Sequence, residues 1–251
     1  MALEFRNVAK EFGALIAVRD ISFEVREGEF VSVVGPSGCG KSTILSMTAG
    51  LYQPTRGEVL VSGEAVRGPN AHVGFMLQKD LLLPWRTIRA NVEFGLEARG
   101  AGRADRRARA EAELRRCKLA GFEDHYPYQL SGGMRQRAAL ARTLAIDPEI
   151  ILLDEPFSAL DAQTKLILQN SFARTIAAER KTTLLITHDL AEAVLMSDRI
   201  LVLSERPGTI VAEIAVDLPH RDEPLKRRMM PEVSGYAAEL FRHLKLEEKA
   251  A

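Results

Sequence analysis

A glycine-rich run that ends in lysine and serine, placed directly after a short apolar segment, constrains the fold of this chain more than any other feature. Residues 30–34 read Phe-Val-Ser-Val-Val, and residues 35–42 read Gly-Pro-Ser-Gly-Cys-Gly-Lys-Ser. An apolar run before a glycine is typical of a buried parallel strand. At a strand-to-helix turn, the spacing Gly-x-x-x-x-Gly-Lys-Ser predicts a loop whose backbone N–H groups surround phosphate oxygens. We expect a nucleotide to be bound by Gly35, Pro36, Ser37, Gly38, Cys39, Gly40, Lys41, Ser42 and Thr43.

Two carboxylates close another apolar segment. Asp154 and Glu155 follow residues 150–153, Ile-Ile-Leu-Leu, and so lie at the carboxyl end of a predicted strand, where ligands bind in parallel α/β sheets. Beside a phosphate loop, Asp154 and the Ser42 hydroxyl can ligate Mg²⁺, and Lys41 can reach the β- and γ-phosphates. Glu155 is then the candidate general base or water-orienting residue for attack on the γ-phosphate. The alternative is that both carboxylates only cap the turn after the strand.

A third run lies between the first two in the sequence. Residues 130–136 read Leu-Ser-Gly-Gly-Met-Arg-Gln, which places a serine and two glycines at the start of a helix, where N–H groups and the helix dipole suit a phosphate. The order and spacing of the three runs make the chain resemble the ATP-binding subunit of ABC transporters, over nearly its whole length. In that family this helix start, here Ser131, Gly132 and Gly133, caps the nucleotide held by a partner copy.

The resemblance implies roles for three further residues. His188 follows the apolar residues 183–187 and matches a histidine that senses the γ-phosphate. Gln78 ends another predicted strand and matches a glutamine that contacts Mg²⁺ and the attacking water. Phe12 matches the aromatic residue that stacks on adenine, the alternative being an ordinary apolar contact in a turn. The implied cofactors are ATP and Mg²⁺, and the implied activity is ATP hydrolysis coupled to transport across a membrane.

Alternating apolar segments and helical patterns predict an α/β fold with a mostly parallel sheet covered by helices. Strand-like segments at residues 3–8 and 21–25 precede the phosphate loop, and strands and helices alternate again from residue 150. Between them, residues 79–147 carry only helical patterns, including a charge-rich helix at 103–118. The resemblance specifies a P-loop NTPase with a RecA-like sheet, an antiparallel β part near the N-terminus and an inserted helical subdomain.

Length and composition fit one domain of this kind. We expect a single ABC-type ATPase domain over residues 1–251, with the helical subdomain at about 79–147 and a short helical tail at about 217–251. The 34 basic and 34 acidic residues cancel, which leaves no electrostatic footprint for nucleic acid. Two cysteines and five scattered histidines suggest neither a disulfide framework nor a zinc site. With no signal-peptide pattern and no apolar run near the roughly 20 residues that span a bilayer, any membrane part is expected in other chains.

The resemblance also implies an assembly. Residues 158–161, Ser-Ala-Leu-Asp, resemble the loop that crosses the interface between two such subunits. Because all the motifs are intact, a symmetric head-to-tail homodimer that sandwiches ATP is the simplest assembly. Pairing with a different ATPase subunit is the alternative.

A short apolar loop points to a subgroup. Residues 81–87, Leu-Leu-Leu-Pro-Trp-Arg-Thr, lie where family members grip a membrane subunit, and their sequence resembles the nitrate, sulfonate and taurine importer group, as does Ser-Glu-Arg-Pro-Gly at 204–208. The resemblance implies a peripheral subunit at the cytoplasmic face of the cell membrane that energises uptake of a small anionic solute. Permease subunits are expected to contact the loop from Leu81 to Trp85, and a solute-binding protein acts indirectly.

Other functions are open at this stage. An exporter ATPase with separate membrane chains is one alternative, and a soluble ABC-type mechanoenzyme is another, although the chain lacks a coiled-coil insertion, a zinc insertion or a second cassette. A docking role predicts that Trp85 is partly exposed in the isolated subunit, whereas the alternative is a core tryptophan.

Three local features give simpler expectations. Cys39 lies near a helix N-terminus, which tends to lower a thiol pKa, so we expect it to be reactive and to be protected by MgATP. Pro207 and Gly208 predict a type II turn between two strands. The arginine-rich residues 99–118, with Glu113 among the interleaved acids, predict a solvated helix face, with contact to anionic lipid headgroups as the alternative.

Overall fold

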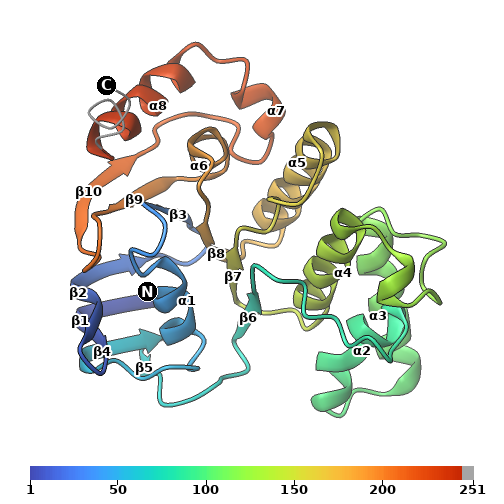
Figure 1. The fold of residues 1–251 in the computed structure, drawn as a ribbon. Helices are drawn as coiled ribbons and strands as arrows, with labels where there is room; N and C mark the ends of the chain where they lie inside the picture. Colours follow the sequence, from blue (N-terminus) through green and yellow to red (C-terminus); the bar gives the residue numbers. More distant parts are fainter. Residues whose placement is uncertain (245–251) are drawn as a thin grey trace.

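Two β-sheets and the helices around them make up the part of the chain that the computed structural model describes, residues 1–244 (Figure 1). The smaller sheet is antiparallel, with the order β2-β1-β4-β5. Its strands are β1 (Leu3–Phe12), β2 (Leu15–Val25), β4 (Arg56–Val61) and β5 (Glu64–Ala65). The antiparallel part predicted near the N-terminus is therefore present.

The larger sheet has six strands in the order β10-β9-β3-β8-β7-β6. Neighbouring strands are parallel except at one edge, where β10 pairs antiparallel with β9. The strands are β3 (Phe30–Val34), β6 (Val73–Met76), β7 (Ile150–Asp154), β8 (Thr182–Ile186), β9 (Arg199–Leu203) and β10 (Ile210–Ala215). The predicted mostly parallel sheet is confirmed.

The central strands are buried on both faces, which explains why they read as continuous apolar runs. Along β7 the side chains alternate between two cores. Ile150 and Leu152 pack between the two sheets, against helix α1 (Lys41–Thr48), whereas Ile151 and Leu153 face the core that includes α4 (Gly132–Ala145) and α5 (Ala162–Ala178). The sheet is therefore covered on both sides, and its carboxyl edge stays open for a ligand.

Three packed helices beyond the β6 edge form most of the predicted insert (Figure 1). They are α2 (Ile88–Ala98), α3 (Arg103–Arg116) and α4, with a short 3₁₀ helix, η1 (Pro127–Gln129), before α4. Thr87 caps the start of α2, since its Oγ1 accepts from Ala90 N at 3.2 Å. The solvated-face prediction for α3 is wrong at Glu113, which is fully buried and lies 3.4 Å from both Arg109 and Arg116.

The remaining helices follow β8. They are α6 (Leu190–Met196), α7 (Pro224–Arg227) and α8 (Glu232–His243), and α8 packs on α6. α7 and α8 lie in the helical tail expected at about 217–251, of which residues 245–251 lie outside the described part. Gly208 does not have the positive φ that a type II turn requires, so the predicted turn type is wrong. Within residues 1–244, every helix is too short or too polar to cross a bilayer.

Candidate nucleotide site

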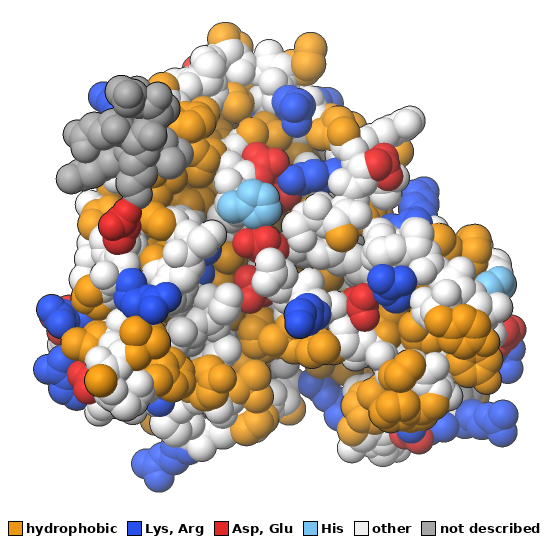
Figure 2. Space-filling model, viewed as in Figure 1, with side chains coloured by type: hydrophobic (Ala, Val, Ile, Leu, Met, Phe, Trp, Pro, Cys, Tyr) orange, Lys and Arg blue, Asp and Glu red, His pale blue; other side chains and the backbone are white. Residues whose placement is uncertain are grey.

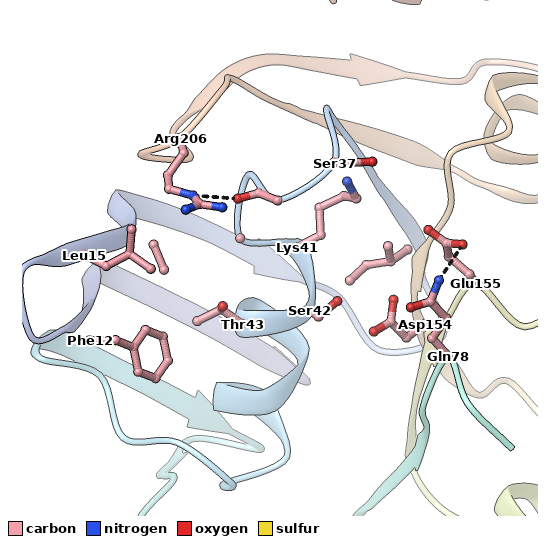
Figure 3. Close-up of a pocket in the computed structure, with 14 residues that line it drawn as sticks. Phe12, Leu15, Ser37, Lys41, Ser42, Thr43, Gln78, Asp154, Glu155 and Arg206 are labelled. Carbon is pink, nitrogen blue, oxygen red and sulfur yellow. Dashed lines mark hydrogen bonds between the residues drawn. The ribbon is translucent and has the colours of Figure 1, made fainter. Parts of the chain in front are cut away.

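A cavity of about 380 Å³ opens at the carboxyl edge of the larger sheet, next to the N-terminus of α1 (Figure 3). Residues from both sheets and from the loops between them line it. They are Phe12, Leu15, Ala17, Ser37, Gly38, Gly40, Lys41, Ser42, Thr43, Gln78, Asp154, Glu155, Ile186 and Arg206. The structure thus brings together most of the residues that the sequence predicted from separate motifs.

The phosphate loop is held in a conformation that only glycine permits at Gly40. This residue has a φ of 106°, and a Cβ atom there would lie 2.4 Å from Cγ1 of Val18. Lys41 follows as the first residue of α1, and its Nζ donates to the carbonyl oxygens of Gly35 at 2.7 Å and Pro36 at 2.8 Å. The lysine therefore spans its own loop, and its side chain also lines the cavity.

Asp154 ends β7 beside the first turn of α1. Its side chain is largely buried, and burial raises the pKa of this carboxyl, while a hydrogen bond from Ser42 and the nearby charge of Lys41 act in the opposite direction. A carboxylate in this position is costly to ionise without a cation nearby. The site is therefore electrostatically suited to a positive ligand at Asp154.

The ends of three adjacent strands meet at one carboxylate oxygen. Oε2 of Glu155 accepts from Gln78 Nε2 at 3.2 Å (dashed in Figure 3) and lies 3.1 Å from His188 Nδ1. Gln78 follows β6, Glu155 follows β7 and His188 follows β8. Glu155 has a φ of 50°, a backbone conformation that residues other than glycine rarely adopt. Strain of this kind is maintained by surrounding structure and is common at functional sites.

Phe12 lies at the other end of the cavity, at the end of β1 (Figure 3). Its ring is 41% exposed and meets Tyr52 edge-on, with centroids 5.3 Å apart. Lys10 Nζ lies 4.9 Å from the ring centroid. An aromatic face that remains accessible at a pocket is available for stacking on a base.

Comparison with known proteins agrees with these motifs. The ABC transporter family model matches residues 18–158. The taurine import ATP-binding protein TauB of Burkholderia pseudomallei is 49% identical over 213 residues, which covers 85% of this chain and 82% of that protein. The nitrate import ATP-binding protein NrtD of Synechocystis is 42% identical over 249 residues, with 96% and 94% covered. A solved dimeric ATP-binding cassette, in a post-hydrolysis state with ADP and phosphate, matches with a TM-score of 0.78 at 34% identity, covering 86% of this chain and 99% of that one.

The chain belongs to the ABC transporter family. It is an ATP-binding subunit with the P-loop NTPase fold and the ATPase activity of that family. The predicted resemblance to the taurine and nitrate importer group is also confirmed.

The start of α4 at Ser131, Gly132 and Gly133, called the signature helix start below, does not line the cavity of its own chain. Ser131 caps α4 by accepting from Met134 N at 3.3 Å, as predicted for a helix start. Ser131, Gly132 and Gly133 are absent from the cavity wall. A Cβ on Gly133 would lie 3.1 Å from Leu160 Cδ2, so the helix start packs closely on the 158–161 loop.

One buried polar side chain that the sequence reasoning missed joins these parts. Gln136, in the second turn of α4, donates from Nε2 to the Glu155 carbonyl at 3.0 Å and accepts from Ala159 N at 3.0 Å. It is 4% exposed. Its position three residues after Gly133 was the available signal, because this spacing puts both residues on one helix face. Gln136 thus ties the signature helix to the loop after Glu155.

The loop before α2 presents Trp85 outward. Trp85 is 72% exposed, as a docking role predicts. Asn91 is buried and holds the loop from inside, accepting from Leu83 N at 2.7 Å and donating to three backbone carbonyls. Arg142 donates to the carbonyl of Leu81 at 2.8 Å.

Hydrophobic side chains gather over the helical insert at the lower right of Figure 2. Exposed apolar side chains within residues 81–128 are Leu81, Trp85, Phe94, Phe122, Tyr126 and Tyr128.

The expectation that the pKa of the Cys39 thiol is lowered is wrong. The thiol is 1% exposed, and burial raises its pKa in spite of the nearby Lys41 ammonium. Burial therefore outweighs the nearby helix N-terminus in setting the pKa of this thiol. Cys39 belongs to the core between the two sheets and is not part of the cavity wall.

Proposed function

We propose that this ABC ATPase is the energy-coupling subunit of an importer for a small anionic solute, and that Glu155 is the base for ATP hydrolysis. The observation that carries the catalytic role is the meeting of Gln78 and His188 at one oxygen of Glu155. A carboxylate held by two polar neighbours beside a phosphate loop is suited to accept a proton from water.

The proposed reaction is attack of water on the γ-phosphorus. Glu155 accepts the proton, the bond from the γ-phosphorus to the β–γ bridging oxygen breaks, and ADP and phosphate leave. Gln78 orients the water, and His188 contacts the γ-phosphate. Lys41 and the N–H groups of residues 35–43 hold the phosphates, while Phe12 stacks on adenine.

The residues at the cavity fit a Mg²⁺ ion. Ser42 and Asp154 are hydrogen-bonded to each other, and Gln78 lines the same cavity, so hydroxyl, carboxylate and amide oxygens are available. Within residues 1–244, no cluster of three or more His, Cys, Asp and Glu side chains could hold a metal on its own. Mg²⁺ is usually bound by one or two protein groups together with substrate phosphates. Bound Mg²⁺ would neutralise charge on the β- and γ-phosphate oxygens.

A second copy of the chain would complete the site. Ser131, Gly132 and Gly133 offer a helix N-terminus that is not part of the cavity wall of their own chain, and a head-to-tail pair would place them on the partner's nucleotide. The dimeric cassette among the solved relatives supports pairing of two copies.

The transport role is supported by the named relatives and by the exposed loop. Two relatives are named as ATP-binding proteins of taurine import and of nitrate import. Permease subunits would bind the loop from Leu81 to Trp85, which puts the subunit at the cytoplasmic face of the membrane, with a solute-binding protein as an indirect partner. The helical subdomain at about 79–147 would then carry docking movements to the ATP site. Both would belong to one domain of residues 1–251, which also includes the short helical tail at about 217–251.

The proposal is tested by the turnover of purified subunit with MgATP. Glu155→Gln should lower kcat by about 10²–10⁴-fold, the usual contribution of a general base. Glu149→Gln is the matched control, since this exposed glutamate precedes the same strand and pairs only with His72 among the described residues. Near-normal turnover by Glu155→Gln would show that Glu155 is not the general base. Absence of MgATP turnover in the unmodified protein would refute the proposed hydrolysis site.

A further inference from the structure

The turn between β9 and β10 is built into the nucleotide site, although the importer role makes no use of it. Gly208 N donates to Ala17 O at 3.0 Å, and Arg19 N donates to Gly208 O at 2.9 Å, which fastens the turn to β2. A Cβ on Gly208 would lie 2.1 Å from the carbonyl oxygen of Cys39. The turn therefore packs directly on the phosphate loop and needs a glycine to do so.

This packing delivers one cation to the cavity. Arg206 Nε donates to the carbonyl of Gly38, at the tip of the phosphate loop, at 3.0 Å (dashed in Figure 3). Arg206 Nη2 would lie 2.8 Å from a Cβ placed on Gly38, so the guanidinium rests on this glycine. Arg206 lines the same cavity as Leu15 and Phe12, and Figure 3 shows it above Leu15, on the side of the loop tip.

The charges around the cavity favour a second cationic side chain beside Lys41. Asp154 and Glu155 are acidic, and the Lys41 ammonium lies on the loop carbonyls of Gly35 and Pro36. A nucleotide adds several negative charges to this wall. A guanidinium presents N–H groups in a planar fork that matches phosphate oxygens, and the bond from Nε fixes the plane of that fork.

We propose that Arg206 is a nucleotide-binding residue, which contacts phosphate oxygens of ATP through its guanidinium while Nε holds the loop tip at Gly38. The inference rests on the ATP site proposed above. It gives a function to the Ser-Glu-Arg-Pro-Gly run at residues 204–208, which the importer role alone leaves unused.

The test compares ATP affinity, by isothermal titration calorimetry, and steady-state kinetics for three variants. Arg206→Gln removes the charge and keeps a polar side chain, Arg206→Lys keeps the charge, and Arg67→Gln removes a charge from an exposed arginine after β5 that does not line the cavity. Arg206→Gln should weaken ATP binding about tenfold or more, as expected for a lost hydrogen bond to a charged group. KM should rise with little change in kcat, because the contact exists in both ground and transition states.

Arg206→Lys should recover only part of the lost affinity, because it keeps the charge but not the planar fork. Arg67→Gln should bind like the unmodified protein, and all three variants should keep the thermal midpoint. Unchanged ATP affinity in Arg206→Gln would overturn the role of Arg206 alone, while the proposed ATP site would stand. Equal losses in Arg206→Lys and Arg206→Gln would also overturn it, because the charge would then not reach the nucleotide. Failure of the unmodified protein to bind ATP would overturn both.

Discussion

Replacing Trp85 by alanine should separate docking from folding. About a quarter of this side chain is covered, since it is 72% exposed. Truncating a buried tryptophan costs about 3–5 kcal/mol, so the covered part of Trp85 accounts for about 1 kcal/mol of the free energy of unfolding. If the ring is an interface anchor, its loss costs about 2 kcal/mol or more of binding free energy, which is about 30-fold in affinity for the membrane partner.

The assay has three readouts on one variant. Urea unfolding gives the stability change, ATP turnover of the free subunit gives the integrity of the site, and co-purification with the permease subunits gives docking. Trp85→Ala should change the stability and the ATP turnover little, and it should abolish co-purification with the permease subunits. Leu82→Ala is the neighbouring control: this side chain is 7% exposed, and its truncation should cost about 2–5 kcal/mol of stability. Met229 lies in the tail and is 84% exposed, so Met229→Ala should change neither the stability, nor the ATP turnover, nor the co-purification.

Because the chain has a single tryptophan, its fluorescence reports on the same site. The free subunit should emit at long wavelength and be quenched by iodide, and the emission should shift to the blue when the permease binds. Normal co-purification of Trp85→Ala with the permease would refute the docking role. A blue, unquenched emission in the free subunit would contradict the exposure on which the reasoning depends.

Three further predictions concern the cavity and its support. Phe12→Ala should weaken ATP binding about 10- to 100-fold without changing the preference among purine nucleotides, and an unchanged dissociation constant would return Phe12 to an ordinary contact. Because burial raises the pKa of both thiols, Cys39 and Cys117 should resist maleimide at pH 7 in the folded protein and label fully in urea; rapid labelling of native Cys39 would contradict this. Gln136→Ala should lose about 1–3 kcal/mol of stability, since it leaves buried backbone groups unpaired, and should lower kcat more than it raises KM. Unchanged urea midpoint and kinetics would refute the link to Glu155.

Strand ends were predictable from the sequence because they follow from local pattern. A continuous apolar run predicts a buried strand, and parallel strands end at one edge, so Gln78, Glu155 and His188 were expected at the same side of the sheet. The structure brings Gln78 and His188 within hydrogen-bonding distance of Glu155. The phosphate loop was predictable for the same reason, since its glycines and lysine form one continuous motif.

Contacts made by distant turns were not predictable in this way. Arg206 enters the cavity only because Gly208 fits against the backbone of β2 and the phosphate loop. Cys39 reads as a helix-terminus thiol in the sequence, but packing between the two sheets buries it, and desolvation outweighs the helix terminus. Glu113 lies in a charged run, yet the packing of α3 buries it with Ala110 and Leu114. In each case packing between elements, which the local sequence does not show, decides the environment of the side chain.

ATP-driven pairing of two copies is the step on which the proposed mechanism depends most. Glu155→Gln should bind MgATP, hydrolyse it slowly and accumulate as the closed pair, because the neutral side chain removes negative charge near the γ-phosphate. Light scattering with MgATP should give twice the 27.7 kDa of one chain, and Ser131→Arg in the same background should return the mass of a single chain by blocking the signature helix start. A mass of 27.7 kDa for Glu155→Gln at saturating MgATP would contradict a site completed by a second copy.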